Sequence, residues 1–317
     1  NASRYVNRKA VFSMDQKPYR DLNTYYRALF GGKTAKLSLN GGFTCPNRDG
    51  TLGTGGCLFC SVGGSGEFAQ DASLSIAEQI RQGKSKSSTK WKTPRYIAYF
   101  QAFTNTYAPV DVLRRIYTEA LAQPDIVGLS IATRPDCLGD DVLDLLEELQ
   151  ARTKLWVELG LQTADETTAR FIRRGYENQV FTDAVTALSR RNIPVVAHTI
   201  LGLPGEQKTT ILKTMQFLNA LPIEGVKLQL MHVLEHTDLA NLYREGAYTP
   251  LTKSAYIDLV CDCISHLRPD IVIHRLTGDG DPKLLLAPLW SLQKWDVLNS
   301  IHRELHLRHI HQGDKLK

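Results

Sequence analysis

The stretch DIVGLSIATRPDCLGDDVLDLLEELQARTKLWVELGLQ, residues 125–162, decides the fold class of this chain. Its two ends, DIVGLSIAT and KLWVELGLQ, are almost continuously apolar, as strands are when both faces of their sheet are covered. Between them, GDDVLDLLEELQAR spaces its apolar residues as an amphipathic helix does. A strand, a helix and another strand in this order predict parallel strands joined by a right-handed crossover.

The same alternation of strand and helix continues on both sides of this unit. Further strands are predicted at 35–40, 95–100, 193–202 and 226–234, with helical patterns between them. Six β/α repeats are too few to close the usual eight-stranded barrel. We therefore expect an α/β fold, a partial (βα)6 barrel of the TIM type, with a doubly wound open sheet as the alternative. In both folds, ligands bind at the carboxyl ends of the strands.

The chain is expected to have three regions around this barrel. They are an N-terminal extension at 1–34, the barrel at 35–235 and a C-terminal α/β extension at 236–317. Within the last region, the patterns predict a helix at 252–268, a short strand at 270–276 and a long amphipathic helix at 288–311. We expect this extension to cover the side or the open end of the barrel.

Composition indicates a globular protein of the cell interior. Hydrophobic residues make up 43% of the 317 residues and charged residues 22%, which is ordinary for a soluble protein. No apolar run approaches the roughly 18 residues that span a bilayer, and residues 1–12 lack the apolar core of a signal peptide. Six cysteines are too sparse for a disulfide scaffold. We expect a cytoplasmic protein with no membrane partner.

Positive charge is concentrated in the first third of the chain. Residues 1–95 carry 15 Lys and Arg against 6 Asp and Glu, whereas residues 96–317 carry 23 against 27. The densest basic stretch holds Arg81, Lys84, Lys86, Lys90, Lys92 and Arg95 around Trp91, without an acid. A solvated loop accounts for this stretch by itself, but the excess over the whole first third favours a polyanion such as RNA.

Three of the six cysteines, Cys45, Cys57 and Cys60, lie in one loop at 41–68 together with nine glycines. The loop follows the first predicted strand, so it belongs to the ligand-binding face. A C-x-x-C pair fits a zinc knuckle, a redox pair or an iron–sulfur site. Structural zinc needs four ligands, and this loop has no nearby histidine. Three thiolates would instead leave one iron of a [4Fe–4S] cluster open to a ligand.

The glycines of this loop would let backbone N–H groups approach a cluster and its ligand closely. The remaining cysteines, Cys137, Cys261 and Cys263, lie in or beside helical patterns, and we expect them to be ordinary core thiols.

The loop and its flanks resemble the radical S-adenosylmethionine (SAM) superfamily. The segments KLSLNGGFTCPNRDG (36–50) and GGCLFCSVGGSG (55–66) carry the resemblance, with Phe59 in the aromatic position before the last cysteine. The wide first spacing resembles the Elp3-like branch, and the flanks resemble its bacterial YhcC/YtqA-type proteins. The ending TGDGDPKLLLAPLW (277–290) also resembles that group.

The resemblance implies a [4Fe–4S] cluster on Cys45, Cys57 and Cys60, with SAM on the fourth iron. An electron from a donor such as flavodoxin or ferredoxin would cleave SAM to methionine and a 5′-deoxyadenosyl radical. The implied SAM-binding positions are Gln101, Ala102, Glu158, Gln162, Arg174, His198 and Leu234. Arg174 matches the position that pairs with the methionine carboxylate, and Leu234 lies near the adenine. Because the Elp3-like branch modifies the wobble uridine of tRNA, tRNA is the implied partner.

Three functions remain open at this point. The first is a radical SAM enzyme that acts on tRNA, and the second is a radical SAM enzyme that acts on a small molecule or a protein. The third is a non-catalytic iron–sulfur protein that serves as an adaptor. Turnover of SAM separates the third from the others, and salt-sensitive tRNA binding separates the first from the second.

Overall fold

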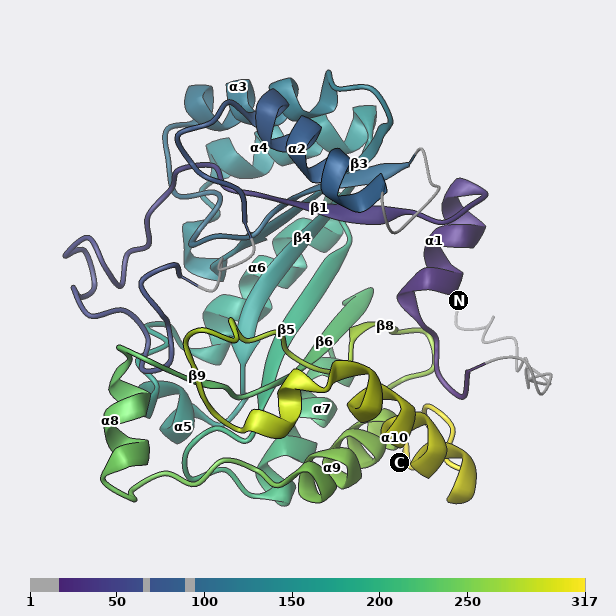
Figure 1. The fold of residues 1–317 in the computed structure, drawn as a ribbon. Coiled ribbons are helices and arrows are strands. Elements are labelled where there is room, and N and C mark those ends of the chain that lie inside the picture. The colour runs from purple at the N-terminus through teal and green to yellow at the C-terminus, as the bar shows by residue number, and fades with distance from the viewer. Residues whose placement is uncertain (1–16, 65–68, 89–94, 317) are drawn as a thin grey trace.

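Seven parallel strands form one curved sheet (Figure 1). This computed structural model describes residues 17–64, 69–88 and 95–316. The strands are β1 (Ala35–Leu39), β2 (Tyr96–Phe100), β3 (Ile126–Thr133), β4 (Lys154–Gln162), β5 (Val195–Leu201), β6 (Gly225–Leu230) and β8 (Val272–Arg275), hydrogen-bonded in this order. The strand order never reverses, so the expected partial barrel is confirmed and the doubly wound alternative is wrong.

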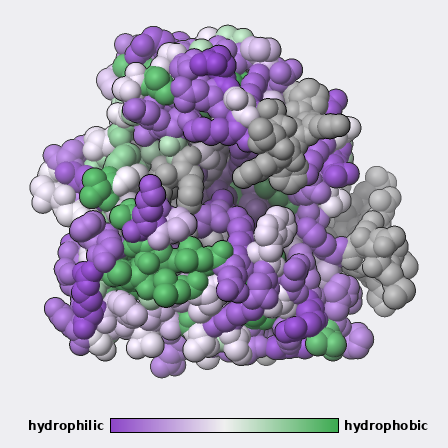
Figure 2. All heavy atoms as spheres, in the orientation of Figure 1, coloured by the Kyte–Doolittle hydropathy of each residue, from purple (hydrophilic) through white to green (hydrophobic). Residues whose placement is uncertain are grey.

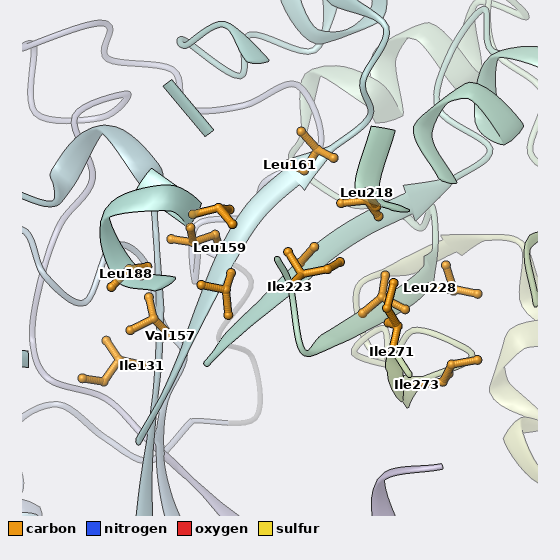
Figure 3. Packing of buried hydrophobic residues seen from close by; sticks show 14 of the residues in the cluster. Ile131, Val157, Leu159, Leu161, Leu188, Leu218, Ile223, Leu228, Ile271 and Ile273 are labelled. Atoms are coloured by element: carbon orange, nitrogen blue, oxygen red, sulfur yellow. The ribbon is translucent and has the colours of Figure 1, made fainter. Parts of the chain in front are cut away.

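Helices cover the outer face of this sheet. They are α2 (Ile76–Ser88), α3 (Val110–Leu121), α4 (Asp140–Arg152), α6 (Asn178–Arg190), α7 (Lys208–Asn219) and α9 (Lys253–His266). Three other helices lie elsewhere: α5 (Glu166–Phe171) follows the end of β4, α8 (Asp238–Arg244) contacts β7, and α10 (Lys294–Leu307) packs on α9. Every second strand residue points towards the covering helices, as Val157 and Leu159 of β4 do in the core around Leu188 of α6 (Figure 3). In the described part of the chain, no helix is long and apolar enough to cross a membrane.

The C-terminal third differs in detail from the expected elements. The predicted strand at 226–234 is interrupted after Leu230, and its end, β7 (Val233–Leu234), pairs with the antiparallel β9 (Leu285–Ala287). The predicted strand at 270–276 is β8, which joins the main sheet beside β6 as a seventh strand. The predicted helix at 288–311 is divided into a 3-10 turn, η2 (Leu289–Leu292), and α10.

Helix α1 (Leu22–Phe30) closes the end of the barrel at which the strands begin. The carboxylate of Asp21 caps the helix by accepting from the backbone N–H of Asn23 at 3.1 Å. On the inner face of the helix, Tyr26 is buried against Trp156 at the start of β4, with ring centroids 5.4 Å apart. The open end of the barrel is therefore the opposite one, where the strands finish and the cysteine loop lies.

Candidate functional site

A cavity of about 370 Å³ opens at the carboxyl ends of the strands. Its wall brings together residues from the cysteine loop, from β1 to β6 and from the segment after β8. Figure 2 shows that this face is hollowed near its centre and mostly hydrophilic, apart from an apolar area over β9. The volume is within the range of small-molecule sites.

All three cysteines of the predicted cluster site, Cys45, Cys57 and Cys60, line this cavity. Hydrogen bonding with Cys60 lowers the pKa of Cys57 to about 6, and the amide of Asn47, 3.4 Å from its Sγ, adds to the shift. A thiolate is the form of cysteine that binds iron. The donor set therefore fits a cluster that takes three protein thiolates.

The backbone around these cysteines is fixed to the rest of the site. The N–H of Leu58 donates to the carbonyl of Ile172 at 3.1 Å, and the carbonyl of Leu58 accepts from Leu239 at 2.9 Å. Phe59, the aromatic residue before the last cysteine, packs on the hydrophobic cluster that contains Leu58 and Ile172. The loop is thus held between the turn after α5 and the start of α8.

One glycine of the loop is required by close packing. Gly64 has φ of +59°, and a Cβ atom there would lie 2.4 Å from the ring of Phe103. The N–H of Phe103 in turn donates to the carbonyl of Gly64 at 3.2 Å. Any side chain at this position would separate the cysteine loop from the segment after β2.

Three sulfurs that each bind a different iron need not meet at one point. Accordingly, residues 17–64, 69–88 and 95–316 contain no group of three His, Cys, Asp or Glu side chains arranged around one position for a single metal ion. Elsewhere, Cys261 and Cys263 are buried in α9 as expected of core thiols. Cys137 departs from that expectation, because the short turn η1 (Pro135–Cys137) leaves it partly exposed.

The structure brings together six of the seven predicted SAM-binding residues. Gln101, Glu158, Gln162, Arg174, His198 and Leu234 all line the same cavity as the cysteines. Ala102 is buried beside the cavity and is not part of its wall. Gln101, Gln162 and Leu234 lie at the ends of β2, β4 and β7, whereas Glu158 and His198 lie within β4 and β5. The roles of these residues towards SAM stay predictions.

Gln162 has an unusual backbone conformation at the end of β4. Its φ is +61°, and the register with β5 shifts between Gly160 and Gln162. The side chain folds back over Gly160, where a Cβ atom would lie 2.6 Å from its Nε2, and its Oε1 lies 3.4 Å from the hydroxyl of Tyr176. Such a conformation is uncommon for a residue other than glycine, and strain of this kind is concentrated at functional sites.

Arg174 is buried, and most of its guanidinium is engaged by the chain itself. Its Nη1 donates to the carbonyls of Leu161 and Thr163 at 3.1 and 2.9 Å, and its Nε donates to the carbonyl of Tyr176 at 2.8 Å. The Nη2 atom contacts the carboxylate of Glu166 at 3.2 Å. Nη2 carries two protons, and its contact with Glu166 accounts for one of them among the described residues.

The floor of the cavity is a layer of polar residues inside the barrel. Its centre is Glu158, which has 0% of its surface exposed. The carboxylate forms ion pairs with Lys36 and Lys227 and accepts from the hydroxyl of Ser130 at 2.6 Å. His198 Nε2 lies 2.6 Å from the same carboxylate. Both oxygens of the predicted SAM ligand Glu158 therefore already have partners in the chain.

Burial and charge set the protonation of this layer. Burial alone would raise the pKa of Glu158, but Lys227 and Lys36 hold it well below its ordinary value, so the group is ionised. Burial and the charge of Lys227 lower the pKa of His198 to about 4, which keeps the ring neutral at pH 7. Burial also lowers the pKa of Lys227 to about 7, against the opposing effect of Glu158.

Sequence reasoning missed four members of this layer, namely Lys36, Tyr99, Ser130 and Lys227. The signal was present: KLS in 35–40 and VKLQL in 226–230 each place a lysine inside an otherwise apolar strand. A charged residue is rarely buried in a sheet without a partner or a function. Only the pairing of the strands shows that both lysines meet the same carboxylate.

The basic stretch of the first third is partly neutralised within the chain. Arg81 pairs with Glu78 at 2.6 Å, and Lys84 lies 3.3 Å from the carboxylate of Asp125. Three further residues of this predicted RNA-binding stretch, Lys90, Trp91 and Lys92, lie outside the described residues.

Comparison with known proteins agrees with this fold and shows the family of the chain. Residues 45–218 match the Radical SAM superfamily, and residues 223–306 match the Radical_SAM C-terminal domain. The chain is 45% identical to YtqA of Bacillus subtilis (strain 168) over 307 residues, covering 97% of this chain and 95% of that protein. It is 30% identical over 191 residues to the tRNA uridine(34) acetyltransferase of Dehalococcoides mccartyi (strain CBDB1), covering 59% of this chain and 40% of that protein.

A solved structure has the same fold. The archaeal Methanocaldococcus infernus Elp3 with an N-terminal deletion aligns with a TM-score of 0.67 at 14% sequence identity. The alignment covers 88% of this chain and 64% of that chain, which is less than two thirds of its length.

The fold and the two family matches place the chain in the class of radical SAM proteins. The superfamily match covers more than half of the chain, and the relative YtqA is similar over almost all of it. The chain belongs to the radical SAM superfamily, and its expected placement among the YtqA-type proteins of the Elp3-like branch is confirmed.

Proposed function

We propose that this protein modifies the wobble uridine of tRNA by radical SAM chemistry. The observation that carries the proposal is the arrangement of Cys45, Cys57 and Cys60 on the wall of one cavity at the mouth of the barrel. When bound, a [4Fe–4S] cluster supplies the electron that cleaves SAM to methionine and a 5′-deoxyadenosyl radical. The electron would reach it from a small redox protein such as flavodoxin or ferredoxin.

The residues of the cavity would then bind and orient SAM. The remaining N–H of Arg174 is suited to the methionine carboxylate, because a charge-assisted hydrogen bond to a carboxylate is strong. Gln101 and Gln162 supply amide groups at two further strand ends, and the buried Leu234 supplies an apolar surface for the adenine. Enclosure by the barrel would shield a reactive radical from water.

Two observations support tRNA as the substrate. One relative with 30% identity is named a tRNA uridine(34) acetyltransferase, although the similarity covers 40% of that protein. In addition, residues 1–95 carry the excess of positive charge and also contain the cysteine loop. A polyanion attracted by this part of the chain would therefore lie beside the mouth of the cavity.

The proposal is tested by comparing the nucleosides of total tRNA from cells with and without this protein. Liquid chromatography with mass spectrometry should show one uridine derivative lost and its precursor accumulated in the deletion strain. Expression of the wild-type protein should restore the derivative, and a Cys57→Ala variant should not. An identical nucleoside profile in the two strains would reject tRNA and favour a small-molecule or protein substrate.

A further inference from the structure

The floor of the cavity holds more positive than negative charge. Lys36 and Lys227 share the single carboxylate of Glu158, while His198 is neutral. Beside them, two more cations share the carboxylate of Asp279, with Arg275 at 3.4 Å and Lys294 at 2.6 Å. Four basic side chains therefore face two carboxylates in this part of the described chain, and three of the four are cations even when Lys227 is deprotonated.

Two of these cations present donors to the cavity. Lys227 and Arg275 are register partners on β6 and β8, and both line the cavity wall. The ammonium of Lys227 donates to the hydroxyl of Tyr99 at 2.9 Å and pairs with Glu158, which accounts for two of its three protons among the described residues. The guanidinium of Arg275 has five N–H groups and contacts Asp279 through one nitrogen.

In most barrels of this type, the side chains below the ligand cavity are apolar. The interior of a TIM-type barrel is usually filled by branched apolar side chains, and burying charge without full compensation is costly. The layer in this barrel is instead charged and borders the cavity. It has fewer carboxylates than basic side chains. A ligand that brings a negative group would complete it.

We propose that Lys227 and Arg275 form a binding site for one negatively charged oxygen group, a carboxylate or a phosphate, on the molecule that the enzyme modifies. This inference rests on the proposed function only in treating the cavity as the reaction chamber. The site differs from the predicted partner of the methionine carboxylate of SAM, Arg174, which lies in the turn after α5. There the amide of Asn47 contacts both the carbonyl of Arg174 and the sulfur of Cys57.

Binding of an anion at this site should be coupled to uptake of a proton. Burial lowers the pKa of Lys227 to about 7, with Lys36 and Arg275 adding to the shift and Glu158 opposing it. A negative group beside Lys227 would raise that pKa again. At pH 7.5 the protein should therefore take up part of a proton for each anion bound.

Isothermal titration calorimetry of the cluster-loaded, SAM-free protein at pH 7.5 tests the inference. The probes are acetate for a carboxylate and sulfate for a phosphate, since neither exchanges a proton near neutral pH. Measurements in two buffers that differ in ionisation enthalpy give the number of protons taken up. We expect one of the two anions to bind with partial proton uptake, and the anion that binds more tightly identifies the group.

Matched variants assign the effect to the two residues. Lys227→Met should weaken anion binding at least tenfold and abolish proton uptake, whereas Arg275→Gln should weaken binding and keep the uptake. Lys213→Met, which removes an exposed lysine on α7, should change neither. If Lys227→Met does not fold, the Arg275→Gln variant still decides, because unchanged binding there would reject the site.

Two results would overturn the inference. One is the absence of binding by both acetate and sulfate, and the other is displacement of the bound anion by saturating SAM, which would assign the floor to the methionine carboxylate. These outcomes are independent of the tRNA proposal. An unchanged tRNA nucleoside profile would reject tRNA as the substrate without affecting a measured anion site. Absence of anion binding would reject the anion site without affecting the tRNA proposal.

Discussion

Arg174 combines a structural role with a predicted ligand-binding role in one side chain. It donates to the buried carbonyls of Leu161 and Thr163 and also lines the cavity. Gln162, predicted for the same ligand, is held far less firmly: its carboxamide oxygen lies 3.4 Å from Tyr176. The two residues therefore offer a way to separate stability from SAM binding.

We predict that Arg174→Ala weakens SAM binding and lowers the free energy of unfolding by about 3 kcal/mol, because it leaves several buried carbonyls without donors. Gln162→Ala should weaken SAM binding without this loss of stability. Equilibrium dialysis of the cluster-loaded variants with SAM measures the first quantity, and urea unfolding without SAM measures the second. An Arg174→Ala variant of wild-type stability would contradict the structural role, and unchanged SAM affinity in Gln162→Ala would contradict its ligand role.

The buried layer predicts a particular loss of stability in acid. His198 has a pKa of about 4 in the folded protein, below its ordinary 6.5, because it is buried beside Lys227. The unfolded chain therefore binds a proton at this position as the pH falls below 6.5, while the folded protein binds it only near pH 4. The contribution of the neutral His198 to the free energy of unfolding is therefore complete above pH 6.5 and is lost between pH 6.5 and 4.

The pH effect is measured by comparison with His198→Gln, which cannot titrate. Between pH 7 and pH 4, the wild type should lose roughly 3 kcal/mol of unfolding free energy more than the variant, from a shift of about two and a half pKa units. Urea unfolding of both proteins at several pH values gives the difference. Parallel stability curves for the two proteins would show that His198 is not held neutral by its surroundings.

At the level of single residues, the sequence predicted which side chains surround the cavity better than it predicted what they contact. Cys45, Cys57 and Cys60 could be selected because three thiols in one glycine-rich loop are typical of a cluster site. The contacts of Glu158 could not, because its partners Lys36 and Lys227 come from strands β1 and β6, far apart in the chain. Their meeting depends on strand register, which the apolar pattern does not specify.

Helix α1 is the element on which the closed end of the barrel depends. Tyr26 is 2% exposed and packs against Trp156 and Phe30, but its hydroxyl has no partner among the described residues. Its ring should therefore stabilise the fold, while its hydroxyl should not.

We predict that Tyr26→Phe leaves the free energy of unfolding unchanged or raises it by up to about 1 kcal/mol, since it removes an unpaired buried hydroxyl. Tyr26→Ala should lower it by about 3 to 5 kcal/mol through loss of the ring and the cavity left behind. Urea unfolding measures both. A clear loss of stability in Tyr26→Phe would mean that the hydroxyl has a partner, such as a buried water.

The segment after α2 is the element expected to meet RNA. The charges to test are that of Lys86 in the last turn of α2 and those of Lys90 and Lys92, which follow this helix in the sequence. We predict that changing these three to Glu weakens tRNA binding and reduces its salt dependence. The reduction should be roughly 0.7 to 0.9 log units of affinity per log unit of salt for each phosphate that the variant no longer neutralises.

Filter binding at several salt concentrations measures this slope. The matched control changes three exposed cations elsewhere, Lys154, Arg190 and Lys213, to Glu and alters the net charge equally. Equal effects of the two triple variants would show a general charge effect and reject this segment as the RNA-binding surface.

Among the elements, most apolar and amphipathic patterns form the expected strands and helices, but the long patterns at 226–234 and 288–311 are each divided in two. The strand β8 has four residues, and its place beside β6 is decided by tertiary contacts across two intervening helices. The helical pattern of residues 164–174 forms only α5, because Arg173 adopts φ of +58° and Gly175 adopts φ of +86°. Such left-handed positions end a helix and are not visible in its hydrophobic pattern.

For the whole molecule, the alternation of strand and helix was sufficient to predict a partial barrel with its ligand site at the carboxyl ends of the strands. Closure of the opposite end by α1 and widening of the sheet by β8 leave one mouth, and the cysteine loop lies there. We therefore propose that three thiolates and a cavity for SAM form one reaction centre at this mouth.

The most direct test of this reaction centre is anaerobic cleavage of SAM. The reconstituted protein, reduced with dithionite, should convert SAM to 5′-deoxyadenosine and methionine, as measured by liquid chromatography with mass spectrometry. The Cys45→Ala/Cys57→Ala/Cys60→Ala variant should bind no cluster and form no 5′-deoxyadenosine. If the wild-type protein contains stoichiometric iron and sulfide but forms no more 5′-deoxyadenosine than this variant, the mouth of the barrel is not a SAM-cleaving centre.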